Sequence, residues 1–159
     1  MSGGTGAVGG VQSVFSGLVT PGILTSTFEE PTTPSALQQA LGAGAAAQIN
    51  FVLAGGSTPQ LWDMSFNGQF SGDAMVTVHF DPSLLGSLPL SDLYVEHYEN
   101  GSWVIPPNQV IDPIHDTITF NTGGFSPYVL ATVPEPGTLA LLSAASFVAF
   151  AAWRRKRLT

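Results

Sequence analysis

The sequence predicts a mainly β protein: an antiparallel β-sandwich, followed by an extended Pro-Glu-Pro joint and one C-terminal transmembrane helix. Three observations lead to this prediction. From residue 48 onward, short apolar or alternating runs are separated by turn residues, which is typical of antiparallel strands. The same region has no long helical pattern. Near the C-terminus, an uncharged apolar stretch precedes a terminal cluster of basic residues.

Residues 1–47 form a Gly/Ala-rich N-terminal region in which one short helix is expected. Apolar pairs such as Val14-Phe15 and Ile23-Leu24 stand between the glycines, as the remains of strands from a larger domain would. The helix is predicted near 35–41, and Gly42 is expected to end it because glycine is common just past a helix terminus.

Residues 48–133 are predicted to form the β-sandwich domain, with seven strands. Apolar and polar residues alternate cleanly in Val76–Phe80, as they do in a half-buried strand. Asn67-Gly68 and Asn100-Gly101 are tight-turn signals, and the second predicts a hairpin with aromatic cross-strand pairs. The predicted strands are Ile49–Ala54, Leu61–Phe66, Ala74–Phe80, Leu93–Tyr98, Ser102–Ile105, Thr117–Phe120 and Tyr128–Val133.

The charges divide the chain into two unlike parts. The 159 residues contain Lys+Arg 4 and Asp+Glu 11, for a net charge of −7. The basic residues are Arg154, Arg155, Lys156 and Arg157, so residues 1–153 carry −11 and the tail carries +4. An acidic body excludes a nucleic-acid-binding protein, which needs a basic surface. The absence of cysteine excludes disulfides, thiolate metal sites and a cysteine nucleophile.

The C-terminal segment is predicted to span a membrane. Residues 137–153 carry no charge, and as a helix they extend about 25 Å, which is close to the lower limit for crossing a bilayer. The basic tail, residues 154–157, is placed as a cytoplasmic anchor under the positive-inside rule. The alternative, a buried core helix, does not normally end in four consecutive cations at the chain terminus.

An extended joint is predicted directly before this segment. Pro134 and Pro136 bracket Glu135, and two prolines so close together continue neither a helix nor a strand. An exposed, extended tripeptide beside a membrane is accessible to a processing enzyme.

The joint, the apolar helix and the basic cluster, in this order over 134–159, resemble the PEP-CTERM sorting signal. The resemblance implies an exported protein of a Gram-negative bacterium that is processed by exosortase, an integral-membrane transpeptidase-like enzyme. It implies that Pro134, Glu135 and Pro136 are recognised, and that the helix and tail anchor the chain temporarily in the inner membrane. Such substrates are associated with exopolysaccharide and the biofilm matrix, so the implied destination is the cell surface or the extracellular matrix.

The predicted topology requires an export signal. A cytoplasmic tail places residues 1–133 outside the membrane, yet the first ten residues lack both a basic region and a Leu-rich apolar region. We therefore expect the N-terminus with its export signal to be missing from this sequence.

The second half of the body also resembles a β-sandwich segment that is often found ahead of PEP-CTERM signals. The matching residues are Val76–Leu85, Asn100–Trp103 and Phe125–Tyr128. This resemblance implies an architecture and no activity.

Two groups of residues are considered as metal ligands. His79, His97 and His115 follow one another at intervals of eighteen residues, and they form a zinc site only if their strands align. We expect His79 and His97 on the sheet surface and His115 in a turn. Asp112 and Asp116 are weak calcium candidates, with Asp81 as a further oxygen ligand, but they are expected first as turn residues. No metal or other cofactor is predicted.

No catalytic residue is predicted. The body has neither a GxSxG nor an HExxH motif and no lysine base, and Glu96 and Glu99 fall on opposite faces of their strand. Four aromatic residues offer rings that stack on sugars, although aromatic residues in a small sandwich more often form the core or cross-strand pairs. These four are Trp62, Tyr94, Tyr98 and Trp103.

The leading functional prediction is an exported, acidic, non-enzymatic protein of the cell surface or matrix, with exosortase as its processing partner. The first alternative is a secreted polysaccharide- or calcium-binding module, and the second is the C-terminal fragment of a larger surface enzyme.

Overall fold

The computed structural model describes residues 7–47 and 58–132, and this part of the chain is mainly β, as predicted. Its strands pair in antiparallel fashion, with one α-helix and two short 3-10 helices between them. In chain order the elements are β1 (Val11–Phe15), β2 (Leu18–Thr20), β3 (Leu24–Glu29), α1 (Pro34–Ala47), β4 (Leu61–Phe66), β5 (Gln69–Phe70), β6 (Ala74–His79), η1 (Pro82–Leu85), η2 (Leu90–Asp92), β7 (Leu93–Glu99), β8 (Ser102–Val104), β9 (Val110–Asp112), β10 (Thr117–Thr122) and β11 (Pro127–Thr132).

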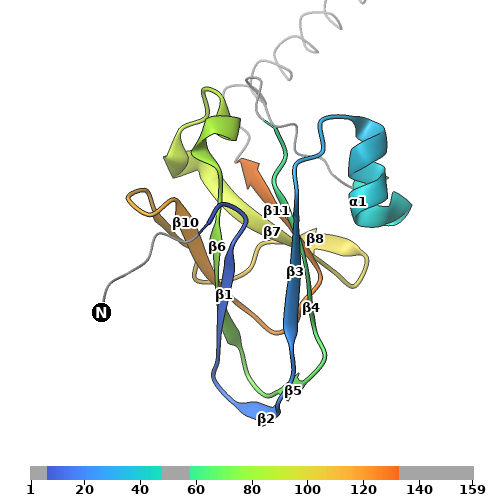
Figure 1. Cartoon of the computed structure of the whole chain (residues 1–159), viewed down its shortest axis with the longest axis vertical. Helices are drawn as coiled ribbons and strands as arrows, with labels where there is room; N and C mark the ends of the chain where they lie inside the picture. The colour runs from blue at the N-terminus through green and yellow to red at the C-terminus, as the bar shows by residue number, and fades with distance from the viewer. Residues whose placement is uncertain (1–6, 48–57, 133–159) are drawn as a thin grey trace, which may run out of the picture.

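The strands form two main sheets and one small one. The four-stranded sheet has the order β1-β6-β10-β9, and the five-stranded sheet has the order β3-β4-β11-β7-β8. β2 and β5 pair at one end of the molecule, and β11 points toward the opposite end (Figure 1).

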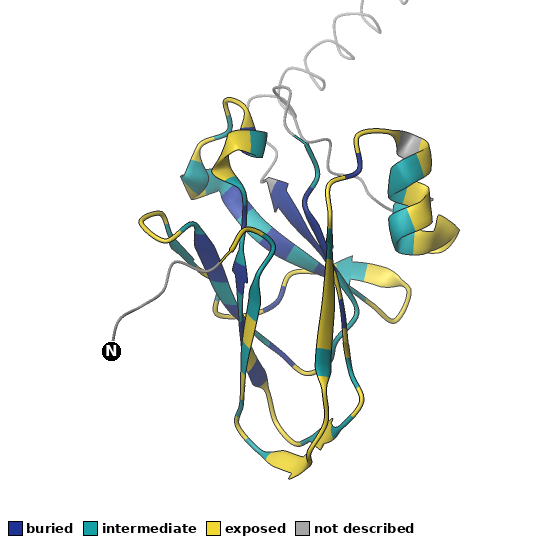
Figure 2. Ribbon diagram, viewed as in Figure 1, coloured by how far each residue is buried: buried dark blue, intermediate teal, exposed yellow. Residues whose placement is uncertain are grey.

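Both main sheets contribute side chains to one core, which lies between them. The buried residues on the strands of both sheets are dark blue in Figure 2. Alternation places every second side chain of a strand in this core, as the burial of Ala74, Val76 and Val78 on β6 shows. The fully buried members from the two sheets include Trp62, Met64, Val76, Val78, Val95, Ile118, Phe120, Tyr128 and Leu130.

Four phenylalanine rings extend this core toward the end that carries β2 and β5. Phe15, Phe66, Phe70 and Phe125 lie in mutual contact, with ring-centroid distances between 4.6 and 6.1 Å. Tilted and edge-on packing of this kind adds to the stability gained from burial.

Six of the seven predicted strands are confirmed as β4, β6, β7, β8, β10 and β11, with ends that differ by at most two residues. The seventh, Ile49–Ala54, lies outside the described residues. β1, β2, β3, β5 and β9 were not predicted as strands. Because β1 and β3 are edge strands of the two main sheets, the sheets begin well before residue 48, where the sequence predicts the sandwich to start.

The predicted helix is present and extends further than expected. α1 continues to Ala47, but Gly42 has φ 78 and ψ 158, so the helical backbone is interrupted at the residue where the sequence predicts the helix to end. Glycine adopts this positive φ without the steric cost that a side chain would bring.

Two glutamine side chains join the sheets, because the amide of each one pairs with a backbone N–H and carbonyl in the way that a neighbouring strand would. Gln60, fully buried before β4, donates from Nε2 to the Asp81 carbonyl (2.8 Å) and accepts at Oε1 from the Asp81 N–H (2.6 Å). Asp81 follows β6, so this clamp joins the five-stranded sheet to the four-stranded one. Gln109, just before β9, pairs in the same way with the N–H and carbonyl of Val95 on β7, both at 2.7 Å.

The Gln109 clamp occupies a place that a longer β8 would have filled. β8 pairs with β7 only from His97 to Glu99, which leaves the backbone of Val95 without a neighbouring strand on that side. A side-chain amide offers the same donor and acceptor as a peptide group, so Gln109 completes the pairing.

Within residues 7–47 and 58–132, no helix is long and apolar enough to cross a bilayer. The predicted Pro-Glu-Pro joint, the helix at 137–153 and the basic tail all lie outside the described residues.

Candidate functional site

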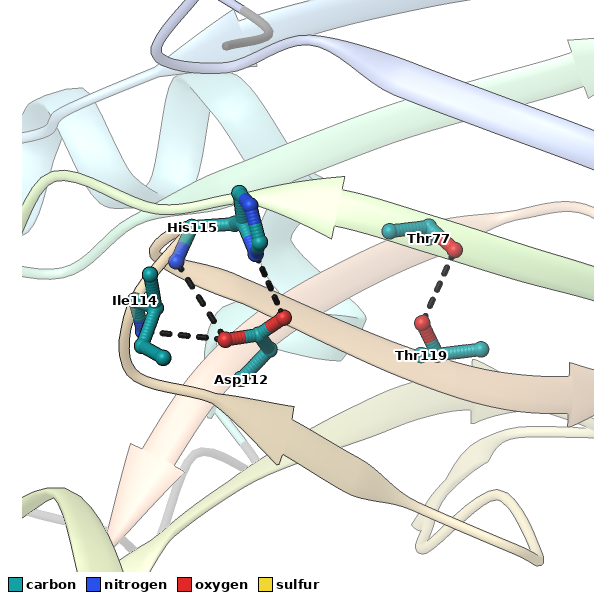
Figure 3. Close-up of polar contacts among 5 residues, drawn as sticks. All are labelled: Thr77, Asp112, Ile114, His115 and Thr119. Atoms are coloured by element: carbon teal, nitrogen blue, oxygen red, sulfur yellow. Dashed lines mark hydrogen bonds and ion pairs between the residues drawn. The ribbon is translucent and has the colours of Figure 1, made fainter. Parts of the chain in front are cut away.

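The turn between β9 and β10 is organised by Asp112 (Figure 3). Its Oδ1 accepts from the N–H groups of Ile114 (2.9 Å) and His115 (3.3 Å), and its Oδ2 lies 2.6 Å from Nδ1 of His115. The hydrogen bond with the His115 side chain, followed by the one from Ile114 N–H, holds the pKa of the Asp112 carboxyl below its usual range. Asp112 therefore serves the turn, as its sequence context predicts.

The other aspartates considered as calcium ligands, Asp81 and Asp116, lie in a helix cap and in a turn. Asp81 caps η1 by accepting from the Ser83 N–H (2.8 Å), and Asp116 sits in the turn with φ 52. Among the described residues, no group of three or more His, Cys, Asp or Glu side chains gathers in a way that could hold a metal ion.

The three histidines lie in different surroundings. His79 points outward from β6, opposite Thr117 on β10, and His115 is exposed in the turn, as predicted. The prediction that His97 lies on the sheet surface is wrong, because His97 follows Leu93 and Val95 on the core side of β7 and is only 4% exposed.

His97 packs as an aromatic ring of the core. Its ring is stacked on that of Tyr128, directly opposite on β11, with centroids 4.3 Å apart and an angle of 6° between the planes. Burial lowers the pKa of His97, since the charged form loses its hydration there. Within the described part, the His97 Nε2 atom is buried without a hydrogen-bond partner. Tyr128 is better satisfied, because its hydroxyl lies 2.9 Å from Oγ1 of Thr122 and 2.7 Å from the Gly124 carbonyl.

The candidate sugar-stacking rings are mostly used inside the protein, as the preferred interpretation predicts. Trp62 is fully buried, with its ring 5.2 Å from that of Phe28 on β3. Tyr98 and Trp103 form a cross-strand pair between β7 and β8, with centroids 5.2 Å apart. The Trp103 indole also donates to the Ala45 carbonyl (3.1 Å), which attaches α1 to the five-stranded sheet.

Tyr94, the fourth of these rings, is half-buried on the outward side of β7. Burial, followed by the negative charge of Glu96, raises the pKa of its hydroxyl to about 12. Burial also raises the pKa of the Glu96 carboxyl. This pair lies on the outer face of the five-stranded sheet, where Glu29 and Asp63 also point outward.

The outer face of the four-stranded sheet has a different character, and we call its outward-pointing residues the neutral face. Thr77 and Thr119 lie at its centre on neighbouring strands, and their hydroxyl oxygens are 2.9 Å apart (Figure 3). Asp112 is its one acidic side chain, and that carboxylate is paired with His115. The neutral face consists of Gln12, Val14, Met75, Thr77, His79, Val110, Asp112, Thr117, Thr119 and Asn121.

The described body ends where a known motif begins. β11 ends at Thr132, and the PEP-CTERM protein-sorting motif matches residues 132–156. The matched range includes Pro134, Glu135 and Pro136, so the resemblance of the C-terminus to this sorting signal is confirmed. Comparison with curated proteins and with solved structures gives no match. The motif marks an exported, membrane-processed protein destined for the cell surface.

Proposed function

We propose that this protein, whose C-terminus carries a PEP-CTERM sorting motif, is a non-enzymatic, acidic structural component of the cell surface or extracellular matrix. One observation carries the proposal: the motif match starts at Thr132, the residue at which β11 ends. The β body is therefore attached directly to a sorting segment and is the cargo that this segment delivers.

In this proposal each part of the C-terminus has one role. Exosortase recognises the joint of Pro134, Glu135 and Pro136, which two prolines keep extended. Residues 137–153 cross the inner membrane of a Gram-negative cell, and the tail of Arg154, Arg155, Lys156 and Arg157 stays in the cytoplasm. Processing then releases the body to the surface or to an exopolysaccharide matrix.

The body suits a structural role because its stability rests on packing and backbone pairing. Residues 1–153 contain no lysine or arginine, so side-chain ion pairs within them require a histidine, as in the Asp112–His115 contact. The core between the sheets and the Gln60 and Gln109 clamps do not depend on salt. These contacts persist outside the cell, where ionic strength varies, while salt screens the repulsion among the acids of the body.

The sorting proposal is tested by changing the joint in the native host. We expect a chain with Pro134, Glu135 and Pro136 replaced by alanine to keep its tail and stay in the membrane fraction, while the natural chain is processed. Pro113→Ala is the matched control, because this proline also follows an acid but lies in the exposed β9–β10 turn. Equal processing of the natural chain and the triple variant would show that processing does not require the joint.

A second candidate function, a polysaccharide- or calcium-binding module, is favoured by the hydroxyl and amide groups on the neutral face. Thr77, Thr119, Gln12 and Asn121 offer hydrogen bonds of the kind that sugars accept and donate. A melting curve with and without Ca²⁺, together with retention on the host's exopolysaccharide, separates this candidate from the structural role. A shift or retention supports binding, and the absence of both supports the structural role.

A third possibility, a fragment of a larger surface enzyme, is tested by reading the gene upstream of Met1. A catalytic domain encoded in the same frame would replace the structural role by this one.

A further inference from the structure

We propose that the neutral face is a self-association surface, on which a second copy of this chain packs face to face about a twofold axis parallel to the strands. The arrangement of two anchored copies rests on the proposed function, whereas the chemistry of the face does not.

The distribution of charge favours the neutral face for contact between copies. Two identical acidic bodies repel each other wherever their carboxylates approach. The outer face of the five-stranded sheet presents Glu29, Asp63 and Glu96, and α1 lies against the same sheet. The neutral face has only Asp112, at its margin and paired with His115. A second copy therefore meets the least repulsion there.

The composition of the neutral face favours contact with another protein over contact with a sugar. Three apolar side chains are well exposed on it: Val14 at 60%, Met75 at 46% and Val110 at 64%. Burying them between two copies is favourable by the hydrophobic effect. None of the outward positions on these four strands is Phe, Tyr or Trp, so the face has no such ring for stacking on a sugar.

The face is also accessible in the described part of the chain. Figure 1 shows α1 beside the five-stranded sheet, away from β1, β6 and β10, and Gln12, Val14, Met75 and Val110 on these strands and β9 are exposed. At the centre, one hydroxyl of the Thr77–Thr119 pair donates to the other within one copy. A second sheet that covers the pair therefore has to accept only the one remaining O–H hydrogen.

The twofold axis follows from where the chain leaves the body. β11 points to the end of the molecule opposite β2 and β5 (Figure 1), so the sorting segment starts from that end. An axis parallel to the strands places both starting points at the same end, as two chains in one membrane require. Contact through the β2–β5 end would instead place them at opposite ends.

The size of the face sets the strength of the contact. β1, β6, β10 and β9 have 5, 6, 6 and 3 residues, and at about 3.3 Å per residue and about 4.8 Å between strands they cover about 320 Å² per copy. Stable interfaces bury about 800 Å² per partner. The pair is therefore weak in dilute solution and forms where anchoring raises the effective concentration.

The experiment uses single-cysteine variants of the full chain, which contains no cysteine of its own. Met75→Cys places a thiol on the neutral face, and Thr27→Cys places one on exposed β3 at the outer face of the five-stranded sheet. Each variant is reconstituted at the same density in phospholipid vesicles and treated with a short bismaleimide. We expect Met75→Cys to form covalent dimers at least tenfold faster than Thr27→Cys.

A second substitution tests whether the contact itself causes the cross-link. Adding Thr119→Asp to Met75→Cys puts a negative charge at the centre of the face, and we expect the tenfold advantage to disappear while the melting temperature shows that the chain is folded. Equal rates for the two single-cysteine variants, or an advantage that survives Thr119→Asp, would overturn the proposal. Host polysaccharide that shields Met75→Cys from a monofunctional maleimide, without any dimer, would overturn it in favour of glycan binding. The vesicles contain no exosortase, so the outcomes do not depend on processing, and flotation of each variant with the vesicles shows that the chain is anchored before the rates are compared.

Discussion

The two main sheets share one core but differ in what their outer sides carry. The five-stranded sheet is attached to α1 through Trp103 and presents acids such as Asp63 and Glu96. The four-stranded sheet presents the neutral face, with Val14 and Met75 exposed. Both sheets pack apolar side chains against the same core, so the two sheets differ mainly on their outer sides.

The largest loss of stability is expected from a substitution on the core side of the four-stranded sheet. Phe120→Ala removes a fully buried ring that packs 5.1 Å from the ring of Tyr128, and it should lower the free energy of unfolding by about 3–5 kcal/mol. Met75→Ala, on the outer side of the same sheet, should change it by about 0.5 kcal/mol or less. Urea unfolding of both variants measures the difference, and equal losses would refute the assignment of inner and outer sides.

The next effect concerns the clamps that join the sheets. Gln60→Ala leaves both backbone groups of Asp81 without their partner, and it should cost about 2–4 kcal/mol because Gln60 is fully buried. Gln109→Ala should cost less, since Gln109 is partly exposed and water can replace it. Gln12→Ala on the neutral face is the matched control, and a loss as large as that of Gln60→Ala would contradict the role of the clamp.

The buried histidine gives the five-stranded sheet a pH dependence. The pKa of His97 is lowered by burial, so the unfolded chain binds this proton more readily than the folded one. The stability that neutral, buried His97 contributes is fully present above pH 6.5, which is the pKa of histidine in the unfolded chain. This stability is lost as the pH falls through 6.5 toward the lower pKa of the folded state. Melting temperatures between pH 8 and pH 5 should therefore fall more in the natural chain than in His97→Phe. Parallel curves would contradict the burial of His97.

The smallest effect is expected at the rim of the neutral face. Asp112→Ala removes the acceptor for the Ile114 and His115 N–H groups, but the turn is exposed and water can take its place. We expect a melting-temperature drop less than half of that caused by Gln109→Ala. Pro113→Ala controls for a change of turn residue that leaves this acceptor intact, and a drop equal to that of Gln60→Ala would show that the turn supports the core.

The sequence predicts the strands of this fold where alternation or turn residues are distinct. β4 has the predicted bounds, and the hairpin at Asn100-Gly101 has positive φ at both residues, 51 and 82, as the tight turn requires. β1 and β3 were missed because their alternation of apolar and polar residues is weak: Ser13 and Ser26 lie on the core side, and Val14 points outward.

The inner and outer sides of strands were harder to predict than the strands themselves. Leu93 and Val95 alternate with Tyr94 and Glu96, which already places His97 on the core side of its strand, but histidine is polar and was therefore expected at the surface. Its stacking on Tyr128 across β7 and β11 explains how the ring is accommodated in the core. The clamps of Gln60 and Gln109 depend on contacts between residues distant in the chain, which no local pattern encodes.

The most direct test of the account is the intact mass of the mature protein recovered from its native host. We expect a chain that ends near Pro134–Pro136 and lacks Arg154, Arg155, Lys156 and Arg157, because processing by exosortase would remove the segment after the joint. A mature chain that still carries the whole basic tail would contradict it, and the β body would then belong to a permanently anchored membrane protein.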